Sequence, residues 1–262
     1  MEVKKKKNKK KIYNNINNEK NKEDNNETNK INDKVKYFIM IPLEQENFIK
    51  TFNDIKEILE KEKPKYFNTN LFIKPQKLHL TLVVLDLKEN KEKTEKVISI
   101  IKSLLNEIKD IANDELYFNF DKLDAFDSIK KAYVIFAKML EDENHYKLKM
   151  ITNLIIKKLI EESILIKNDL QNLKINEEYS DGQLIYTIKF HATLLNVKYL
   201  NRALQKEKKD FIKEIDATEI LKNIKDIKFP DCKMEKINLC AMREDESTGK
   251  YQIIQTFNIL EN

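Results

Sequence analysis

Two of the three histidines in this chain stand in the same short motif, and histidine is the side chain best suited to proton transfer near neutral pH. His79 precedes Thr81 by two residues in KPQKLHLTLVVLDL, and His191 precedes Thr193 by two residues in YTIKFHATLLNV. With eleven threonines in 262 residues, chance would give such a coincidence in roughly one of two hundred sequences. The repeated H-x-T motif therefore indicates shared chemistry.

Each motif lies in a run rich in β-branched and apolar residues, which predicts a strand. On a strand, residues two apart share one face and lie about 6.6 Å apart, so each His and its Thr point the same way while their neighbours face apolar packing. Two imidazoles on opposite sides of a phosphodiester can act as base and acid, and threonine hydroxyls can stabilise the charged oxygens. This chemistry requires no metal, and we expect no cofactor.

The charge of the chain is concentrated at its N-terminus. Residues 1–34 hold eleven Lys against six Asp and Glu, whereas the remaining residues are balanced at 38 of each sign. This Lys/Asn-rich segment has few apolar residues and predicts a disordered arm, and its KKKKNKKK stretch is a candidate nuclear-import or polyanion-binding patch, with compositional drift as the alternative. Phosphate affinity in residues 35–262 must come from a local site, because no net field exists there.

Several function classes are excluded by scarce residues. Gly182 and Gly249 are the only glycines, so a Walker A loop, a dinucleotide fingerprint and a GXXG loop cannot be built. Cys232 and Cys240 lack zinc-binding spacing and indicate reduced thiols, so we expect an intracellular protein in the cytoplasm, the nucleus or both. No apolar run approaches 18 residues, and no secretory signal is expected.

Hydrophobic periodicity predicts alternating groups of strands and helices. We expect strands at 35–43, 77–87, 115–122, 131–139, 184–197, 233–243 and 250–258. We expect helices at 44–63, 91–112, 143–164, 200–214 and 217–224, and a polar loop between lobes at 166–183. Because strands and helices do not alternate strictly, the pattern favours an α+β fold with mainly antiparallel sheets.

At these motifs the sequence resembles the 2H phosphoesterase superfamily, whose mark is a pair of H-x-T/S motifs on a duplicated α+β fold. More narrowly, it resembles the branch that holds the central domain of A-kinase anchoring protein gamma/delta and the C-terminal domain of activating signal cointegrator complex subunit one. The matching stretches are YFIMIPL, KLHLTLVVLDL, YVIFAKM, FHATLLN and INLCAM, within about residues 35–260.

The resemblance implies a bilobal fold with two mainly antiparallel sheets, outer helices and a central cleft. It also implies binding of nucleotides, such as AMP or CMP, or of RNA, and cleavage of phosphodiester bonds, including 2′,5′ linkages in some members. His79 and His191 would be the acid/base pair, and Thr81 and Thr193 the phosphate ligands. Glycines that relatives often carry before the YVIFAKM strand are replaced here by AFDSIKK.

Kinase anchoring is not expected of this chain. In the anchoring relative that activity resides in a helix outside the shared domain, whereas this sequence stops at Asn262, just after a predicted strand. The KH domain of the cointegrator relative is also lacking. Neither the oligomeric state nor the natural substrate follows from the sequence.

Two aromatic residues are candidates for stacking a nucleobase. Phe38 lies on the first predicted strand and Phe126 in the AFDS loop, and such stacking is worth roughly 1–3 kcal/mol per base. Core packing is the alternative for both. The third histidine, His145, lies among charged residues in EDENHYK and is expected to be a solvated surface residue.

These observations leave three hypotheses for the function. The first is a metal-independent phosphodiesterase acting on nucleotides or short RNA, including 2′,5′-linked oligonucleotides or cyclic nucleotides. The second is a module that binds a nucleotide or RNA in the same cleft without turnover, aided by its basic arm. The third is a protein-interaction scaffold that recruits partners through the arm, as in anchoring proteins.

Overall fold

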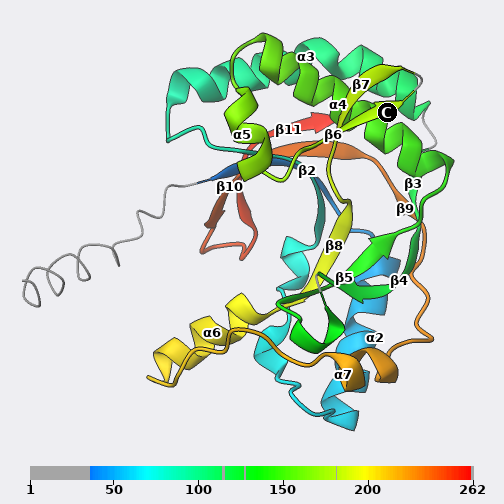
Figure 1. Ribbon diagram of the computed structural model, residues 1–262, viewed down its shortest axis with the longest axis vertical. Helices are drawn as coiled ribbons and strands as arrows, with labels where there is room; N and C mark the ends of the chain where they lie inside the picture. The colour runs from blue at the N-terminus through cyan, green and yellow to red at the C-terminus, as the bar shows by residue number, and fades with distance from the viewer. Residues whose placement is uncertain (1–35, 114–115, 127, 181, 261–262) are drawn as a thin grey trace, which may run out of the picture. The chain divides into compact units, whose positions relative to one another are not determined.

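Seven strands form one antiparallel sheet in the computed structural model, which describes residues 36–113, 116–126, 128–180 and 182–260 (Figure 1). Their order across the sheet is β11-β10-β1-β2-β8-β5-β4. The strands are β1 (Tyr37–Pro42), β2 (His79–Leu85), β4 (Phe120–Ala125), β5 (Val134–Met139), β8 (His191–Asn196), β10 (Lys236–Glu244) and β11 (Tyr251–Asn258). The predicted arm, residues 1–34, lies outside the described residues and stays a prediction.

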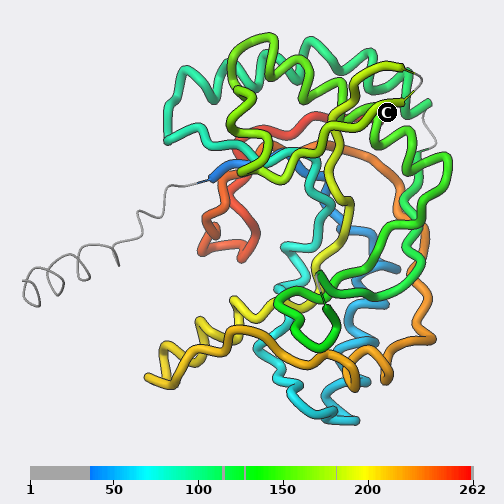
Figure 2. The backbone as a smooth tube through the Cα atoms, viewed as in Figure 1, coloured from blue at the N-terminus to red at the C-terminus, as the bar shows by residue number. Residues whose placement is uncertain are grey.

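The sheet consists of two halves that meet at the motif strands. Strands β11, β10, β1 and β2 form one half, and β8, β5 and β4 form the other, with Leu80 opposite Ala192 at the junction. In each half, the strand beside the motif strand shifts register once, after Ile39 in β1 and after Ile135 in β5. The predicted α+β fold with two antiparallel strand sets is therefore confirmed, and the two sets are continuous through β2 and β8 (Figure 2).

Helices cover the sheet on the face that carries the main core. They are α2 (Glu46–Glu62), α3 (Lys91–Ala112), α4 (Glu143–Glu161), α5 (Lys167–Asn172), α6 (Val197–Lys206) and α7 (Thr218–Asn223), with short 3₁₀ turns at Thr69–Leu71, Pro75–Lys77 and Ile129–Lys131. Helices α3 and α4 pack together, with α3 against β11 and α4 against β2. Helix α2 lies beside the other half, where the ring of Phe48 meets that of Phe120 on β4 (Figure 1).

The α3 helix shows how strongly local signals set its ends. The observed bounds, Lys91–Ala112, are those predicted. At the start of the helix, the Asn90 side chain accepts a hydrogen bond from the Lys93 N–H and so fixes the first turn. At the end, Asn113 adopts a left-handed φ of 50° and its N–H bonds to the Lys109 carbonyl oxygen. Between these caps, an apolar stripe faces the core, with Val97 and Ile101 fully buried.

The prediction of a polar loop at 166–183 is wrong, because this segment contains helix α5 and most of a β-hairpin. The hairpin is made of β6 (Asn176–Ser180) and β7 (Gln183–Thr187), and a further two-stranded pair joins β3 (Tyr117–Phe118) to β9 (Cys232–Lys233). Leu170 and Ile175 are buried, and the buried Asn153 of α4 accepts a hydrogen bond from the Tyr186 N–H at 2.9 Å. Tertiary packing on α4 therefore orders a segment whose exposed side is polar.

The second motif strand, predicted at 184–197, is also divided in the structure. Residues 183–187 belong to β7, whereas the motif itself opens β8 at His191. No described helix is long and apolar enough to cross a membrane.

The junction between the halves gives a test of the packing. Leu80 is fully buried, so Leu80→Ala should lower the free energy of unfolding by about 2–5 kcal/mol through lost burial and a residual cavity. Ile253→Ala on β11, where the side chain is 43% exposed, should cost less than about 1 kcal/mol. Urea denaturation of both variants measures the difference, and equal losses would contradict the proposed burial at the junction.

Candidate active site

The two motifs lie on adjacent antiparallel strands, each at the start of its strand. Because Leu80 faces Ala192, antiparallel pairing sets His79 opposite Thr193 and Thr81 opposite His191. All four side chains are half-buried, whereas the residues between them are fully buried in the core. The predicted arrangement, with a polar pair on one face and apolar packing on the other, is thus present in both motifs.

The two imidazole rings are held by the same hydrogen bond. Nδ1 of His79 lies 2.7 Å from the carbonyl oxygen of Lys77, and Nδ1 of His191 lies 2.8 Å from that of Lys189. Because a carbonyl oxygen only accepts, Nδ1 carries the proton in each ring. Nε2 of each ring has no partner among the described residues and is therefore available to a ligand.

Neither threonine hydroxyl forms a hydrogen bond with another described residue. Thr81 and Thr193 can therefore donate to the oxygens of a bound anion without losing a protein contact. Together with the two Nε2 atoms, these hydroxyls give four polar groups on one face of neighbouring strands.

Each imidazole also packs against two aromatic rings. The His79 ring lies 5.2 Å from that of Phe38 and 5.5 Å from that of Tyr251, between ring centroids. The His191 ring lies 4.8 Å from that of Phe126 and 5.3 Å from that of Phe136. These contacts fix the ring planes and remove water from the imidazoles.

Burial is the main cause of the pKa shifts of both histidines. It lowers the pKa of His79 to about 4, partly opposed by the hydrogen bond with the Lys77 carbonyl, and the charge on His191 lowers it further. Burial also lowers the pKa of His191, and the charge of Lys189 acts in the same direction. Because the two motifs lie on paired strands, a proton on one ring disfavours a proton on the other.

The two candidate stacking residues differ in exposure. Phe38 is 1% exposed and belongs to a small apolar cluster with Met40 and Cys240, on the sheet face opposite the main core, which favours the packing alternative. Phe126 is half-buried beside His191. Base stacking by either ring stays a prediction.

The third histidine was expected to be a solvated surface residue, and this expectation is wrong. His145 is half-buried in the first turn of α4, where its ring lies 5.5 Å from the ring of Phe190, and burial lowers its pKa. Phe190 directly precedes His191, and its buried ring is the neighbour that shields the His145 ring from solvent.

Two site lysines were missed in the sequence, although they extend the repeat to K-x-H-x-T. Lys77 is buried, and its Nζ lies 2.5 Å from Oε2 of Glu244. Lys189 is exposed, and its Nζ lies 4.8 Å from the centre of the Phe126 ring. Each lysine stands two residues before its motif histidine, and this repeated spacing could have revealed both lysines in the sequence. Tyr251, whose ring contacts that of His79, lies in no comparable sequence pattern.

The family of this chain follows from its match to a known domain. The AKAP7 2′5′ RNA ligase-like domain matches residues 35–259. The chain belongs to this family. The match confirms the resemblance to the 2H phosphoesterase superfamily, whose members are phosphoesterases.

Similar solved structures include LigT of E. coli complexed with 3′-AMP, at 14% identity and a TM-score of 0.42, covering 87% of this chain and 99% of LigT. Usb1 of Kluyveromyces marxianus with uridine monophosphate is 9% identical with a TM-score of 0.39, over 86% of this chain and 97% of Usb1. TT0787 of Thermus thermophilus is 10% identical with a TM-score of 0.46, over 86% of this chain and 97% of TT0787. No curated protein matches the sequence.

The described residues contain no group of three or more His, Cys, Asp or Glu side chains placed to hold a metal ion.

The lowered pKa of His79 predicts a loss of stability in acid. An unfolded histidine titrates near 6.5, so between pH 6.5 and about 4 the unfolded chain binds more protons than the folded chain. The stabilisation is fully present above pH 6.5 and is lost as the pH falls. The titration of His79 alone should lower the free energy of unfolding by on the order of 1–2 kcal/mol when the pH falls from 7 to 5.

Urea denaturation at the two pH values measures this effect in the original chain and in His79→Gln. The variant should lose less stability on acidification, because its amide does not titrate. An identical loss in both proteins would show that His79 titrates normally in the folded state.

Proposed function

We propose that the protein is a metal-independent phosphodiesterase that acts on nucleotides or short RNA. The observation that carries this proposal is the pair of H-x-T motifs on adjacent antiparallel strands, with Nε2 of both rings and both hydroxyls available on one face. Such a set matches the needs of acid–base catalysis at a phosphorus atom bound between two imidazoles. Membership of a phosphoesterase superfamily supports it.

The phosphate would be held by groups from both motifs. The hydroxyls of Thr81 and Thr193 donate to its non-bridging oxygens, and the exposed ammonium of Lys189 adds a positive charge beside His191. The negative charge of the phosphate favours a protonated imidazole, which neither ring holds readily in the free protein.

The coupling between the rings supports a division of roles. Repulsion between the two imidazolium charges is mutual, so the pair holds one proton more readily than two, and we assign that proton to His191. His79 would then be the general base and His191 the general acid.

For a 2′,5′-linked substrate, Nε2 of His79 takes the proton of the neighbouring 3′-hydroxyl group. That oxygen forms a bond to phosphorus, and the bond from phosphorus to the 5′-oxygen breaks. The imidazolium of His191 gives its Nε2 proton to the departing 5′-oxygen. The products are a 2′,3′-cyclic phosphate and a 5′-hydroxyl group, and the enzyme is left with the proton on His79.

The second candidate is a nucleotide-binding module without turnover, and one observation favours it. Burial lowers the pKa of both imidazoles, which favours the neutral form of each ring in the free protein and opposes the protonated imidazole that a general acid requires. Such a site binds an anion through hydroxyl and imidazole groups. Titration of AMP, CMP and a short RNA, followed by analysis for products, separates the candidates, since binding without any product favours the module.

The catalytic proposal predicts that each motif histidine is required. His79→Ala and His191→Ala should each lower kcat on 2′,5′-oligoadenylate, 3′,5′-linked RNA or a 2′,3′-cyclic nucleotide by at least about 100-fold, because each loses one proton transfer. A chelator should leave the rate of the original chain unchanged. Product formation followed by chromatography measures both effects.

His145→Gln is the matched control, since it alters the one histidine outside the motifs and should retain turnover. Circular dichroism establishes that all three variants are folded. Full activity in either motif variant would contradict the acid–base pair, and complete loss of turnover in chelator would contradict the metal-independent reaction.

A further inference from the structure

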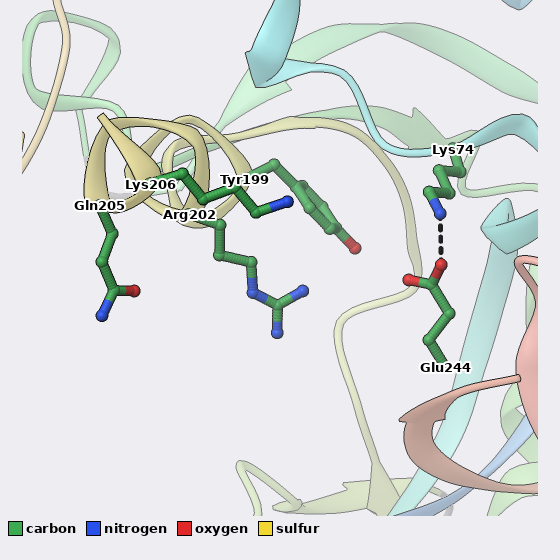
Figure 3. Close-up of a pocket in the computed structure, with 6 residues that line it drawn as sticks. All are labelled: Lys74, Tyr199, Arg202, Gln205, Lys206 and Glu244. Carbon is green, nitrogen blue, oxygen red and sulfur yellow. Dashed lines mark hydrogen bonds and ion pairs between the residues drawn. The ribbon is translucent and has the colours of Figure 1, made fainter. Parts of the chain in front are cut away.

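A pocket of about 620 Å³ shares Glu244 with Lys77, which stands two residues before His79. It is lined by Lys74, Tyr199, Arg202, Gln205, Lys206 and Glu244. In Figure 3, Tyr199 and Arg202 extend from α6 on the side where the Lys74–Glu244 ion pair lies. The catalytic proposal uses none of these residues.

Both motif segments contribute to this pocket. Lys74 precedes the first motif by five residues, and α6, which carries Tyr199, begins directly after the second motif strand. Tyr251 joins the pocket to the site, since its ring contacts that of His79, and burial and the neighbouring hydroxyl group of Tyr199 raise its pKa. One pair of tyrosines therefore separates the pocket from the catalytic imidazole.

The charge of the pocket is positive. Three cations line it against the single carboxylate of Glu244, which is already shared between Lys74 and the buried Lys77. Arg202 and Lys206 are exposed, and neither is paired with a carboxylate among the described residues. Arg202 instead lies 5.7 Å from the centre of the Tyr199 ring, which holds the guanidinium at the pocket wall.

We propose that this pocket binds a second phosphate of the substrate, one nucleoside away from the phosphate held by the two histidines. The inference rests on the proposed function, because it assigns the first phosphate to the His79–His191 pair. A guanidinium and two ammonium groups are the side chains that bind phosphate oxygens best, and a pocket that is open to solvent suits a group that stays partly hydrated. The preferred substrate is therefore a phosphorylated or longer oligonucleotide.

Two small probes test this without any need for turnover. Adenosine 3′-monophosphate has one phosphate, whereas adenosine 3′,5′-bisphosphate has two phosphates on one nucleoside. By calorimetry at low salt, the bisphosphate should bind about tenfold more tightly or better. In Arg202→Gln/Lys206→Gln the ratio of the two affinities should fall to within about twofold, and added salt should reduce the ratio in the original chain.

The matched control is Lys222→Gln/Lys225→Gln, which removes two exposed charges at and just after α7, outside the pocket, and should keep the original ratio. The single variant Arg202→Gln should give an intermediate ratio and guards against a folding defect in the double variant. Equal affinity for the two probes, binding of neither, or an unchanged ratio in the double variant overturns the inference. If the protein prefers the bisphosphate but turns over no substrate, the proposed catalytic function is contradicted, whereas the assignment of a phosphate-binding pocket is retained.

Discussion

The antiparallel pairing of β2 with β8 at Leu80 and Ala192 is the contact on which the rest of the site depends. It reverses one motif relative to the other, so each histidine faces the threonine of the other motif across the two strands. A slip of one residue in either strand would turn its polar pair into the core. The full burial of both paired residues opposes such a slip, and hydrophobic packing on one face of the sheet therefore sets the positions of the four polar side chains on the other.

The orientation of each imidazole ring is set by local hydrogen bonding. Each Nδ1 bonds to the carbonyl oxygen two residues earlier in its own chain segment, so the ring orientation is set within the five-residue K-x-H-x-T segment. The aromatic neighbours, in contrast, come from other strands and a loop, and they withdraw the rings from water. The sequence repeat thus determines where the proton sits on each ring, and tertiary packing determines how readily a second proton is added.

The contrast between local signals and tertiary contacts explains which features could be predicted from the sequence. The α3 helix was located to the residue, since its apolar stripe and its asparagine caps are local signals. The motif histidines were found because histidine is rare in this chain. The β6–β7 hairpin was missed, although Gly182 with its left-handed φ of 76° lies between the two strands, because the exposed residues of both strands are polar. The Lys77–Glu244 pair joins residues 167 positions apart, and no local pattern reports such a contact.

In the proposed reaction, two neutral imidazoles lack a general acid until an anion binds, because the burial of both rings lowers their pKa values. A phosphodiester brings the negative charge that stabilises one imidazolium, while repulsion between the rings keeps the other neutral. On this proposal, binding of the substrate itself produces one protonated and one neutral imidazole, which are the acid and the base. A neutral molecule in the same place would leave both rings unprotonated, so discrimination in favour of phosphate esters would arise from the pKa values of the pair as well as from the shape of the site.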